Sequence, residues 1–177
     1  MLKKFVDLGI SKEIIKALTD IKIENPTEIQ SKAIPLILNE TNDFVGLAKT
    51  GTGKTGAFGL PLLQLIDLKS NAIQVVILVP TRELGQQILN NFKQFSKYLP
   101  EITIISVCGG TPIKPQIEQL KEANHIVIAT PGRLIDLIQR KAINIKNTSY
   151  LVLDEADEMV TVLKEGLDEI VSELPKK

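Results

Sequence analysis

Residues 47–56 read LAKTGTGKTG, and this stretch constrains the fold more than any other part of the chain. From Ala48 to Thr55 the spacing matches the phosphate-binding loop G-x-x-x-x-G-K followed by Ser or Thr, with alanine in place of the first glycine. Such a loop leads from a strand into a helix, and backbone N–H groups at the start of that helix bind phosphate oxygens. The stretch therefore predicts a nucleotide-binding α/β fold.

The residues of this loop have complementary chemistry. Gly51 and Gly53 allow the backbone to turn its N–H groups toward an anion. Lys54 would neutralise the β- and γ-phosphates, and the Thr55 hydroxyl would bind Mg²⁺. A plain turn rich in glycine and threonine would not need Lys-Thr directly after its last glycine. The predicted nucleotide-binding residues of the loop are Thr50, Gly51, Thr52, Gly53, Lys54 and Thr55.

Five short apolar runs predict buried strands, at residues 44–48, 75–79, 102–107, 126–129 and 150–153. Patterns typical of helices lie between most of them. Alternating strands and helices indicate a parallel sheet sandwiched between helices. With 177 residues, of which 44% are hydrophobic, one globular domain with a full core is expected.

Polar or glycine-rich residues follow every predicted strand. After the phosphate loop these are PTREL at 80–84, GG at 109–110, TPGR at 130–133 and DEAD at 154–157. Any one of these loops could serve only turn and capping chemistry. Ligands of open α/β sheets bind beyond the carboxyl ends of the strands. Together the five loops therefore predict one functional edge.

The run at 150–153 leads directly into two carboxylates, as in a Walker B element. Asp154 would hold Mg²⁺, directly or through water, and Glu155 is the candidate general base or positioner for a water molecule. Alternatively, both acidic residues only suit the dipole at a helix N-terminus. With a phosphate loop in the same chain, we predict ATP or GTP hydrolysis, with Lys54, Asp154 and Glu155 as catalytic residues.

Composition limits the partners and the setting. Lys plus Arg and Asp plus Glu number 21 each, so any nucleic acid must be held by a local set of residues rather than by a basic surface. The single cysteine, Cys108, excludes an intramolecular disulfide framework and is expected to be a small buried residue. No signal peptide or apolar run of membrane-spanning length is seen, so we expect a cytoplasmic location and no membrane partner.

Residues 154–157 spell DEAD, and the chain resembles the first RecA-like lobe of a DEAD-box ATP-dependent RNA helicase. The resemblance covers nearly the whole chain, in order. It comprises a Q-motif region near 26–30, motif I at 48–55, motif Ia at 80–84, the doublet at 109–110, motif Ib at 130–133 and motif II at 154–157. It implies a RecA-like P-loop NTPase fold over residues 1–177, with ATP and Mg²⁺ as cofactors. Motif III and a second lobe, which carries arginine fingers in this family, are expected outside these residues.

The resemblance also implies an RNA site that holds the backbone of one strand and tolerates any base sequence. The positions that match are Pro80, Thr81, Arg82, Gly109, Gly110, Thr130, Pro131, Gly132 and Arg133. From the residues alone, the favoured interpretation of Arg82 and Arg133 is a solvated or salt-bridged surface arginine, and only the resemblance places an RNA role above it. Thr130 suits a helix N-cap with Pro131 at the first helical position, which can present N–H groups to a phosphate.

For the nucleotide base, the resemblance implies that Gln30 reads the adenine edge and that Phe5 supports the adenine pocket. The residues themselves favour a different role, because residues 27–30 form a capping box in which Gln30 reaches back to the Thr27 N–H. One side-chain amide has few hydrogen bonds to give. Where the family usually has an aromatic ring against adenine, this chain has Ile23, which can cover one face but cannot stack.

Two functions of different classes use these motifs. The first is an enzyme lobe that couples ATP binding and hydrolysis to local RNA unwinding or remodelling of RNA–protein complexes. The second is an ATP-switched RNA clamp or assembly platform with little unwinding. A DNA-directed helicase is a third and weaker reading.

Overall fold

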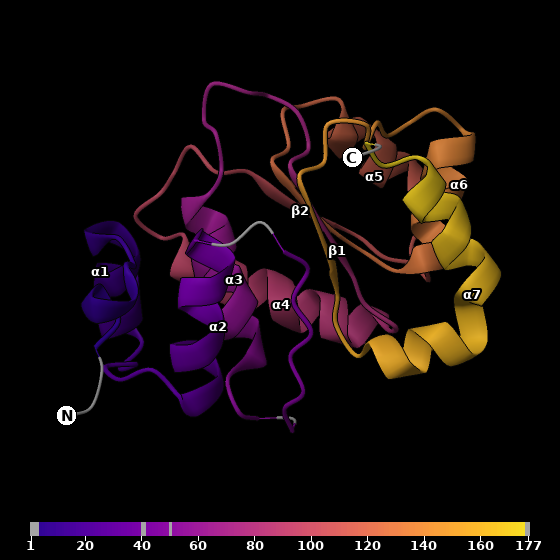
Figure 1. The fold of residues 1–177 in the computed structure, drawn as a ribbon. Coiled ribbons are helices and arrows are strands. Elements are labelled where there is room, and N and C mark those ends of the chain that lie inside the picture. Colours follow the sequence, from indigo (N-terminus) through magenta and orange to yellow (C-terminus); the bar gives the residue numbers. More distant parts are fainter. Residues whose placement is uncertain (1–3, 40–41, 50, 176–177) are drawn as a thin grey trace. The chain divides into compact units, whose positions relative to one another are not determined.

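Residues 4–39, 42–49 and 51–175 are described in the computed structural model of the chain (Figure 1), without the side chains of 160–165. The chain divides into two compact units. The first comprises Met1–Asp67 and Asn91–Glu101, and the second comprises Leu68–Asn90 and Ile102–Lys177.

The first unit is helical in the part that the structure describes. At its beginning, the exposed Gln64 side chain accepts from the Ser11 N–H and donates to the Gly9 carbonyl, each at 2.8 Å. Large apolar side chains such as Ile14, Leu60 and Phe92 form its core. Its elements are η1 (Val6–Leu8), α1 (Lys12–Asp20), α2 (Glu28–Asn39), α3 (Lys54–Gln64) and the end of α4 (Arg82–Phe95).

The second unit contains a four-stranded parallel sheet with strand order β2-β3-β1-β4. In its register Val75 lies beside Ile126 on one side and Tyr150 on the other. Parallel neighbours need crossover connections, and helices supply them. The elements are β1 (Val75–Leu78), β2 (Ile104–Val107), α5 (Ile113–Leu120), β3 (Ile126–Ala129), α6 (Pro131–Gln139), β4 (Tyr150–Leu153) and α7 (Ala156–Ser172).

Helices cover the sheet of the second unit on both faces. Alternate strand residues such as Val76 and Val127 share one buried cluster with Leu134 of α6 and Ile170 of α7. Figure 1 shows α6 and α7 side by side on this face. On the other face Gly85 of α4 lies so close that an added Cβ would stand 2.7 Å from the Cys108 Sγ. The predicted parallel sheet between helices is confirmed, as is the burial of Cys108.

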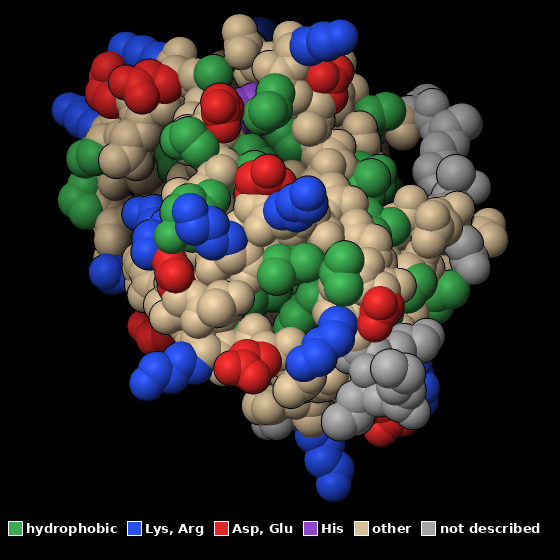
Figure 2. Space-filling model, turned by 90° about the vertical axis from the view of Figure 1, so that its left-hand side faces the viewer, with side chains coloured by type: hydrophobic (Ala, Val, Ile, Leu, Met, Phe, Trp, Pro, Cys, Tyr) green, Lys and Arg blue, Asp and Glu red, His purple; other side chains and the backbone are tan. Residues whose placement is uncertain are grey.

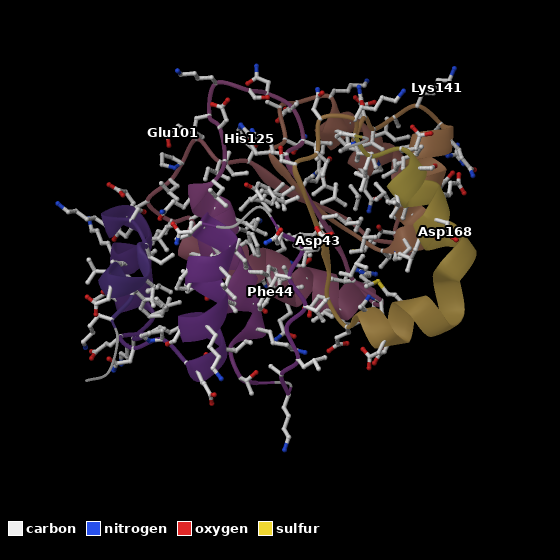
Figure 3. All side chains as sticks on the ribbon, viewed as in Figure 1. Asp43, Phe44, Glu101, His125, Lys141 and Asp168 are labelled. Atoms are coloured by element: carbon white, nitrogen blue, oxygen red, sulfur yellow. The ribbon has the colours of Figure 1, made fainter. Side chains whose placement is uncertain are left out.

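The prediction of a strand at residues 44–48 is wrong. The described part of this segment has no strand partner, and Phe44, Val45 and Leu47 are 43%, 83% and 93% exposed. Figure 3 labels Phe44 at the start of this segment. A strand exists only where a neighbour completes its hydrogen-bond ladder, and apolar residues alone do not supply that neighbour. The other four predicted strands form within their predicted bounds.

Charges on the surface are mixed. Figure 2 shows lysine and arginine side chains interspersed with aspartate and glutamate over the face displayed, as the equal totals of 21 predict. Within the described residues, no helix combines the length and the apolar character needed to cross a membrane.

Candidate functional site

The phosphate loop has the backbone shape that its glycines predict. Gly51 and Gly53 adopt left-handed φ angles of +79° and +90°, which side chains disfavour, and α3 begins directly afterwards at Lys54. The Thr52 hydroxyl closes the loop by donating to the Lys49 carbonyl at 2.7 Å. The loop therefore places backbone N–H groups at the positive end of a helix, which is chemistry suited to phosphate. Thr50, also predicted for this site, lies outside the described residues.

Gln30 joins the start of α2 to this loop. Its Oε1 accepts from the Thr27 N–H at 2.9 Å, and its own N–H donates to Thr27 Oγ1 at 3.5 Å, so the predicted capping box is present. In addition, Gln30 Nε2 donates to the Gly53 carbonyl at 3.1 Å. The side chain is only 5% exposed. Adenine reading by Gln30 stays a prediction, and the amide already has two internal partners.

Glycines make room for that amide. A Cβ at Gly53 would lie 2.6 Å from Gln30 Nε2, and a Cβ at Gly56 would lie 2.7 Å from the same atom. Sequence reasoning missed this contact. A signal was available, because Gly56 lies inside a helix, where glycine costs about 1 kcal/mol relative to alanine and needs a packing reason.

The residues predicted for the base differ in exposure. Phe5 is buried at the start of η1, so it can support a pocket only from within the core of the first unit. Ile23 is half-buried, and its N–H donates to the Leu18 carbonyl at 2.9 Å. Their roles toward adenine stay predictions.

In the second unit, the loop after β1 leads into α4. The Thr81 hydroxyl accepts from the Leu84 N–H at 3.3 Å, so Thr81 caps the helix, and Pro80 before it is half-buried. Arg82 is exposed, and its side chain lies over the turn after β2, where a Cβ on Gly110 would stand 3.9 Å from Arg82 Nη1. Gly110 itself is exposed with φ +79°. The structure therefore brings the predicted residues of these two loops together.

The loop after β3 contacts the same turn. Thr130 Oγ1 accepts from the Gly109 N–H at 3.0 Å, so this side chain does not cap α6, although Thr130 occupies the N-cap position and Pro131 the first helical position. Gly132 is exposed in the first turn of α6. The predicted N-cap position is thus correct, but the Thr130 hydroxyl binds the turn after β2 instead of the first turn of α6.

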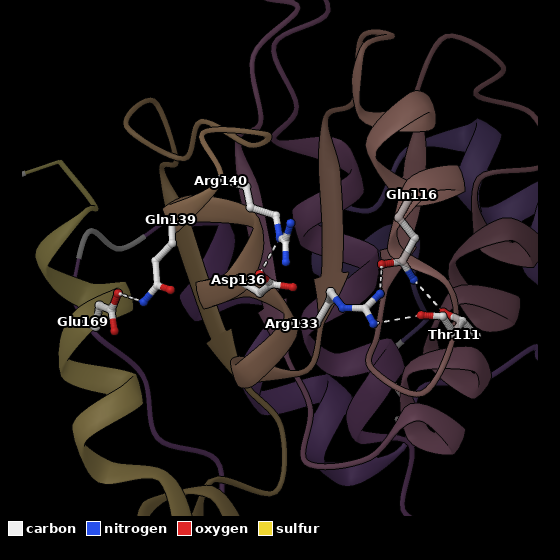
Figure 4. Close-up of polar contacts among 7 residues, drawn as sticks. All are labelled: Thr111, Gln116, Arg133, Asp136, Gln139, Arg140 and Glu169. Carbon is white, nitrogen blue, oxygen red and sulfur yellow. Dashed lines mark hydrogen bonds and ion pairs between the residues drawn. The ribbon is translucent and has the colours of Figure 1, made fainter.

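Arg133 points into the protein (Figure 4). Its Nη1 donates to Gln116 Oε1 at 2.5 Å, and its Nη2 donates to the Thr111 carbonyl at 2.9 Å. Sequence reasoning did not single out Gln116, which is 8% exposed. A glutamine within the polar pattern of a short helix carries no signal of burial, so only the fold shows this contact.

Asp154 and Glu155 directly follow β4, as predicted. Asp154 is 8% exposed, and its N–H extends the ladder by donating to the Leu78 carbonyl at 3.0 Å. Glu155 is the N-cap of α7 in a left-handed conformation, with φ 55° and ψ 50°. For a residue with a Cβ this costs on the order of 1 kcal/mol, and such strain is concentrated at functional sites.

The donor chemistry fits magnesium bound together with a nucleotide. Among the described residues, no three His, Cys, Asp or Glu side chains gather into a protein metal site. Mg²⁺ usually binds through one or two carboxylates plus substrate phosphates, and the Asp154 carboxylate and the Thr55 hydroxyl are each oxygen donors of this kind. Binding of Mg²⁺ by these residues stays a prediction.

The comparisons with known proteins agree on one family. Residues 27–177 match the profile of the family described as DEAD/DEAH box helicase. The chain is 40% identical over 173 residues to the ATP-dependent RNA helicase DeaD of Mycobacterium tuberculosis, covering 97% of this chain and 31% of that protein. It is 42% identical over 175 residues to the ATP-dependent RNA helicase CshA of Listeria monocytogenes, covering 98% of this chain and 33% of that protein.

Two solved structures share the fold. A DEAD box protein from the hyperthermophile Methanococcus jannaschii matches with a TM-score of 0.90 and 38% identity, over 98% of this chain and 48% of that one. Saccharomyces cerevisiae Dbp5 L327V, bound to RNA and ADP BeF3, matches with a TM-score of 0.88 and 30% identity, over 98% and 44%. The chain spans about a third of the length of the curated relatives it matches.

Proposed function

Because the chain belongs to the DEAD/DEAH box helicase family, we propose that it is the nucleotide- and RNA-binding lobe of an ATP-dependent RNA helicase. The observation that carries this proposal is the phosphate loop, in which Gly51 and Gly53 are left-handed and Gly53 directly precedes the first residue of α3. The RecA-like fold supports it. The whole protein would couple ATP binding and hydrolysis to local RNA unwinding or remodelling.

For the nucleotide, each residue has a proposed task. The backbone of Gly51–Gly53 and the Lys54 ammonium hold the phosphates, and Thr55 and Asp154 hold Mg²⁺. Magnesium bound there would neutralise charge on the β- and γ-phosphates. Glu155 orients the attacking water and accepts its proton. The strained backbone of Glu155 supports a functional role for this carboxylate.

For RNA, we propose that the loops after β1, β2 and β3 hold the sugar–phosphate backbone of one strand. Exposed groups are available there in Arg82, Gly110 and Gly132. Contacts to phosphates carry no base information, so binding is expected to tolerate any sequence. The further partner is a second RecA-like lobe of the same parent chain. We also propose a cytoplasmic location, because a single cysteine cannot form an intramolecular disulfide and such bonds are rare in the reducing cytosol.

The test is duplex release by the parent protein. With ATP, a short RNA duplex should separate, and with a non-hydrolysable ATP analogue it should separate without repeated turnover. Stable binding of single strands with little duplex release in either case would favour the alternative, an ATP-switched RNA clamp or assembly platform. Equal stimulation of ATP turnover by a deoxy strand would favour a DNA-directed helicase.

A further inference from the structure

We propose that Gln116 is a positioning residue for RNA, which acts by fixing the Gly109–Gly110 turn, and that Arg133 serves the same turn rather than binding phosphate as a free cation. The inference rests on the proposed RNA function of this edge. It assigns a role to Gln116, and it gives Arg133 a different task from that of the exposed Arg82.

The Gln116 amide is fully engaged with the residues that flank the turn. Its Nε2 donates to the Cys108 carbonyl at 3.1 Å and to Thr111 Oγ1 at 2.9 Å, while its Oε1 accepts from Arg133. Thr111 Oγ1 in turn donates to the Cys108 carbonyl at 3.4 Å. A buried amide with all these bonds holds its partners in one geometry, because each lost bond would leave a polar group unsatisfied.

Arg133 strengthens the same arrangement from α6. Two nitrogens of its guanidinium donate inward, to Gln116 and to the Thr111 carbonyl (Figure 4), and the residue is half-buried. The Arg140 side chain in the same view pairs with Asp136 at 2.6 Å on the exposed surface. The two arginines therefore differ in kind, since only Arg133 is bound to backbone and to a buried amide.

The turn between these contacts is the part that would meet RNA. The Gly109 N–H is held by Thr130 Oγ1, and Gly110 is exposed in a left-handed conformation. When such a turn is already held in its binding conformation, less conformational entropy is lost as the RNA binds. Loosening it should weaken RNA binding without changing how many phosphates are neutralised. The affinity then falls while its dependence on salt stays the same.

The test measures the affinity of the chain for a labelled single-stranded RNA at several salt concentrations. We expect Gln116→Leu and Arg133→Lys each to weaken binding about fivefold to tenfold, which is the effect of one or two lost hydrogen bonds. The slope of log affinity against log salt concentration should stay unchanged in both variants. Arg82→Ala should instead make the slope shallower by about 0.7, the value for one single-strand phosphate. Arg140→Ala, the matched control at the C-cap of α6, should change neither quantity.

A second readout needs no RNA. The backbone amide resonances of Gly109 and Gly110 should shift or broaden in Gln116→Leu, and Gln116→Glu, which keeps an acceptor for Arg133, should restore part of the wild-type pattern. If Gln116→Leu fails to fold, Arg133→Lys carries the same comparison. Unchanged glycine resonances, or an Arg133→Ala variant whose slope falls as that of Arg82→Ala does, would overturn the proposal. Failure of the wild-type chain to bind RNA would instead count against the proposed function.

Discussion

The side-chain nitrogen of Gln30 donates a 3.1 Å hydrogen bond to the Gly53 carbonyl and so ties the start of α2 to the phosphate loop. The oxygen of the same amide accepts from the Thr27 N–H. This amide is buried against Gly53 and Gly56, where a Cβ would displace it. Gln30 therefore supports the shape of the phosphate loop whatever base the nucleotide carries.

We predict that Gln30→Ala weakens ADP and GDP binding by similar factors of about tenfold, since it removes the hydrogen bond to the Gly53 carbonyl that ties α2 to the loop. It should also lower the free energy of unfolding by about 1 to 2 kcal/mol, because the capping box is lost. Calorimetric titration and denaturant unfolding measure the two effects. Weaker binding of ADP alone would show instead that Gln30 reads the adenine edge.

Lys54→Ala is predicted to abolish detectable ATP binding and to leave the fold intact. Lys54 is half-buried at the first position of α3, and the hydrophobic core does not depend on its charge, so its removal should not unfold the chain. Titration with Mg-ATP tests the affinity, and circular dichroism with thermal unfolding serves as the control for folding. If the variant bound ATP as the wild type does, the phosphates would have to lie elsewhere.

Ile23 predicts a modest preference for adenine nucleotides. An aliphatic side chain covers a base by contact alone and lacks the stacking of a ring. We expect ADP to bind less than a hundredfold more tightly than GDP, a difference below about 2.7 kcal/mol at ~1.36 per tenfold. Ile23→Phe should raise the preference. A larger preference in the wild-type chain would mean that other groups select the base.

Asp20 makes stability depend on pH at the acid end. Hydrogen bonds from Lys97 and then Tyr98 hold the pKa of the Asp20 carboxyl below its ordinary value of 3.8. A folded-state pKa below the unfolded one contributes stability above the unfolded value, and this stability is lost as pH falls through the folded value. Asp20→Asn should therefore lower the melting temperature at pH 7 and have little effect well below pH 3.8. Tyr98→Phe, which removes one of the two bonds, should show a smaller change at pH 7 with the same pH dependence.

The sequence was informative where local chemistry decides the structure. Four apolar runs became strands, and the capping box formed, because burial and side-chain bonds to nearby backbone favour these forms locally. Residues 44–48 have an equally apolar run, but a strand also needs a partner, and pairing is a property of the whole sheet.

The candidate site shows the same limit. The glycine conformations of the phosphate loop follow from the motif. The Gln116 contacts and the inward turn of Arg133 join residues 17 positions apart through the packing of α5 and α6 around the sheet edge. No rule of sequence spacing predicts such a contact, so the residues alone favoured a solvent-exposed side chain for Arg133.

The last prediction is that residues 1–177, tested alone with RNA, hydrolyse ATP near the background rate. Lys54 and the metal supply only part of the positive charge that phosphoryl transfer needs. An arginine finger typically adds 10³ to 10⁵ in rate, and family resemblance assigns it to the proposed second lobe. The chain spans 31% of its relative from M. tuberculosis, which leaves room there for such a lobe.

The measurement is phosphate release, first from the chain with RNA and then after adding the separately expressed second lobe of the parent protein at high concentration. The rate of the mixture should rise, and Glu155→Gln in the chain should remove the rise, because the amide cannot accept a proton from the attacking water. Rapid RNA-dependent turnover by residues 1–177 alone would refute this account, since the charge that stabilises the transition state would then already be present among them.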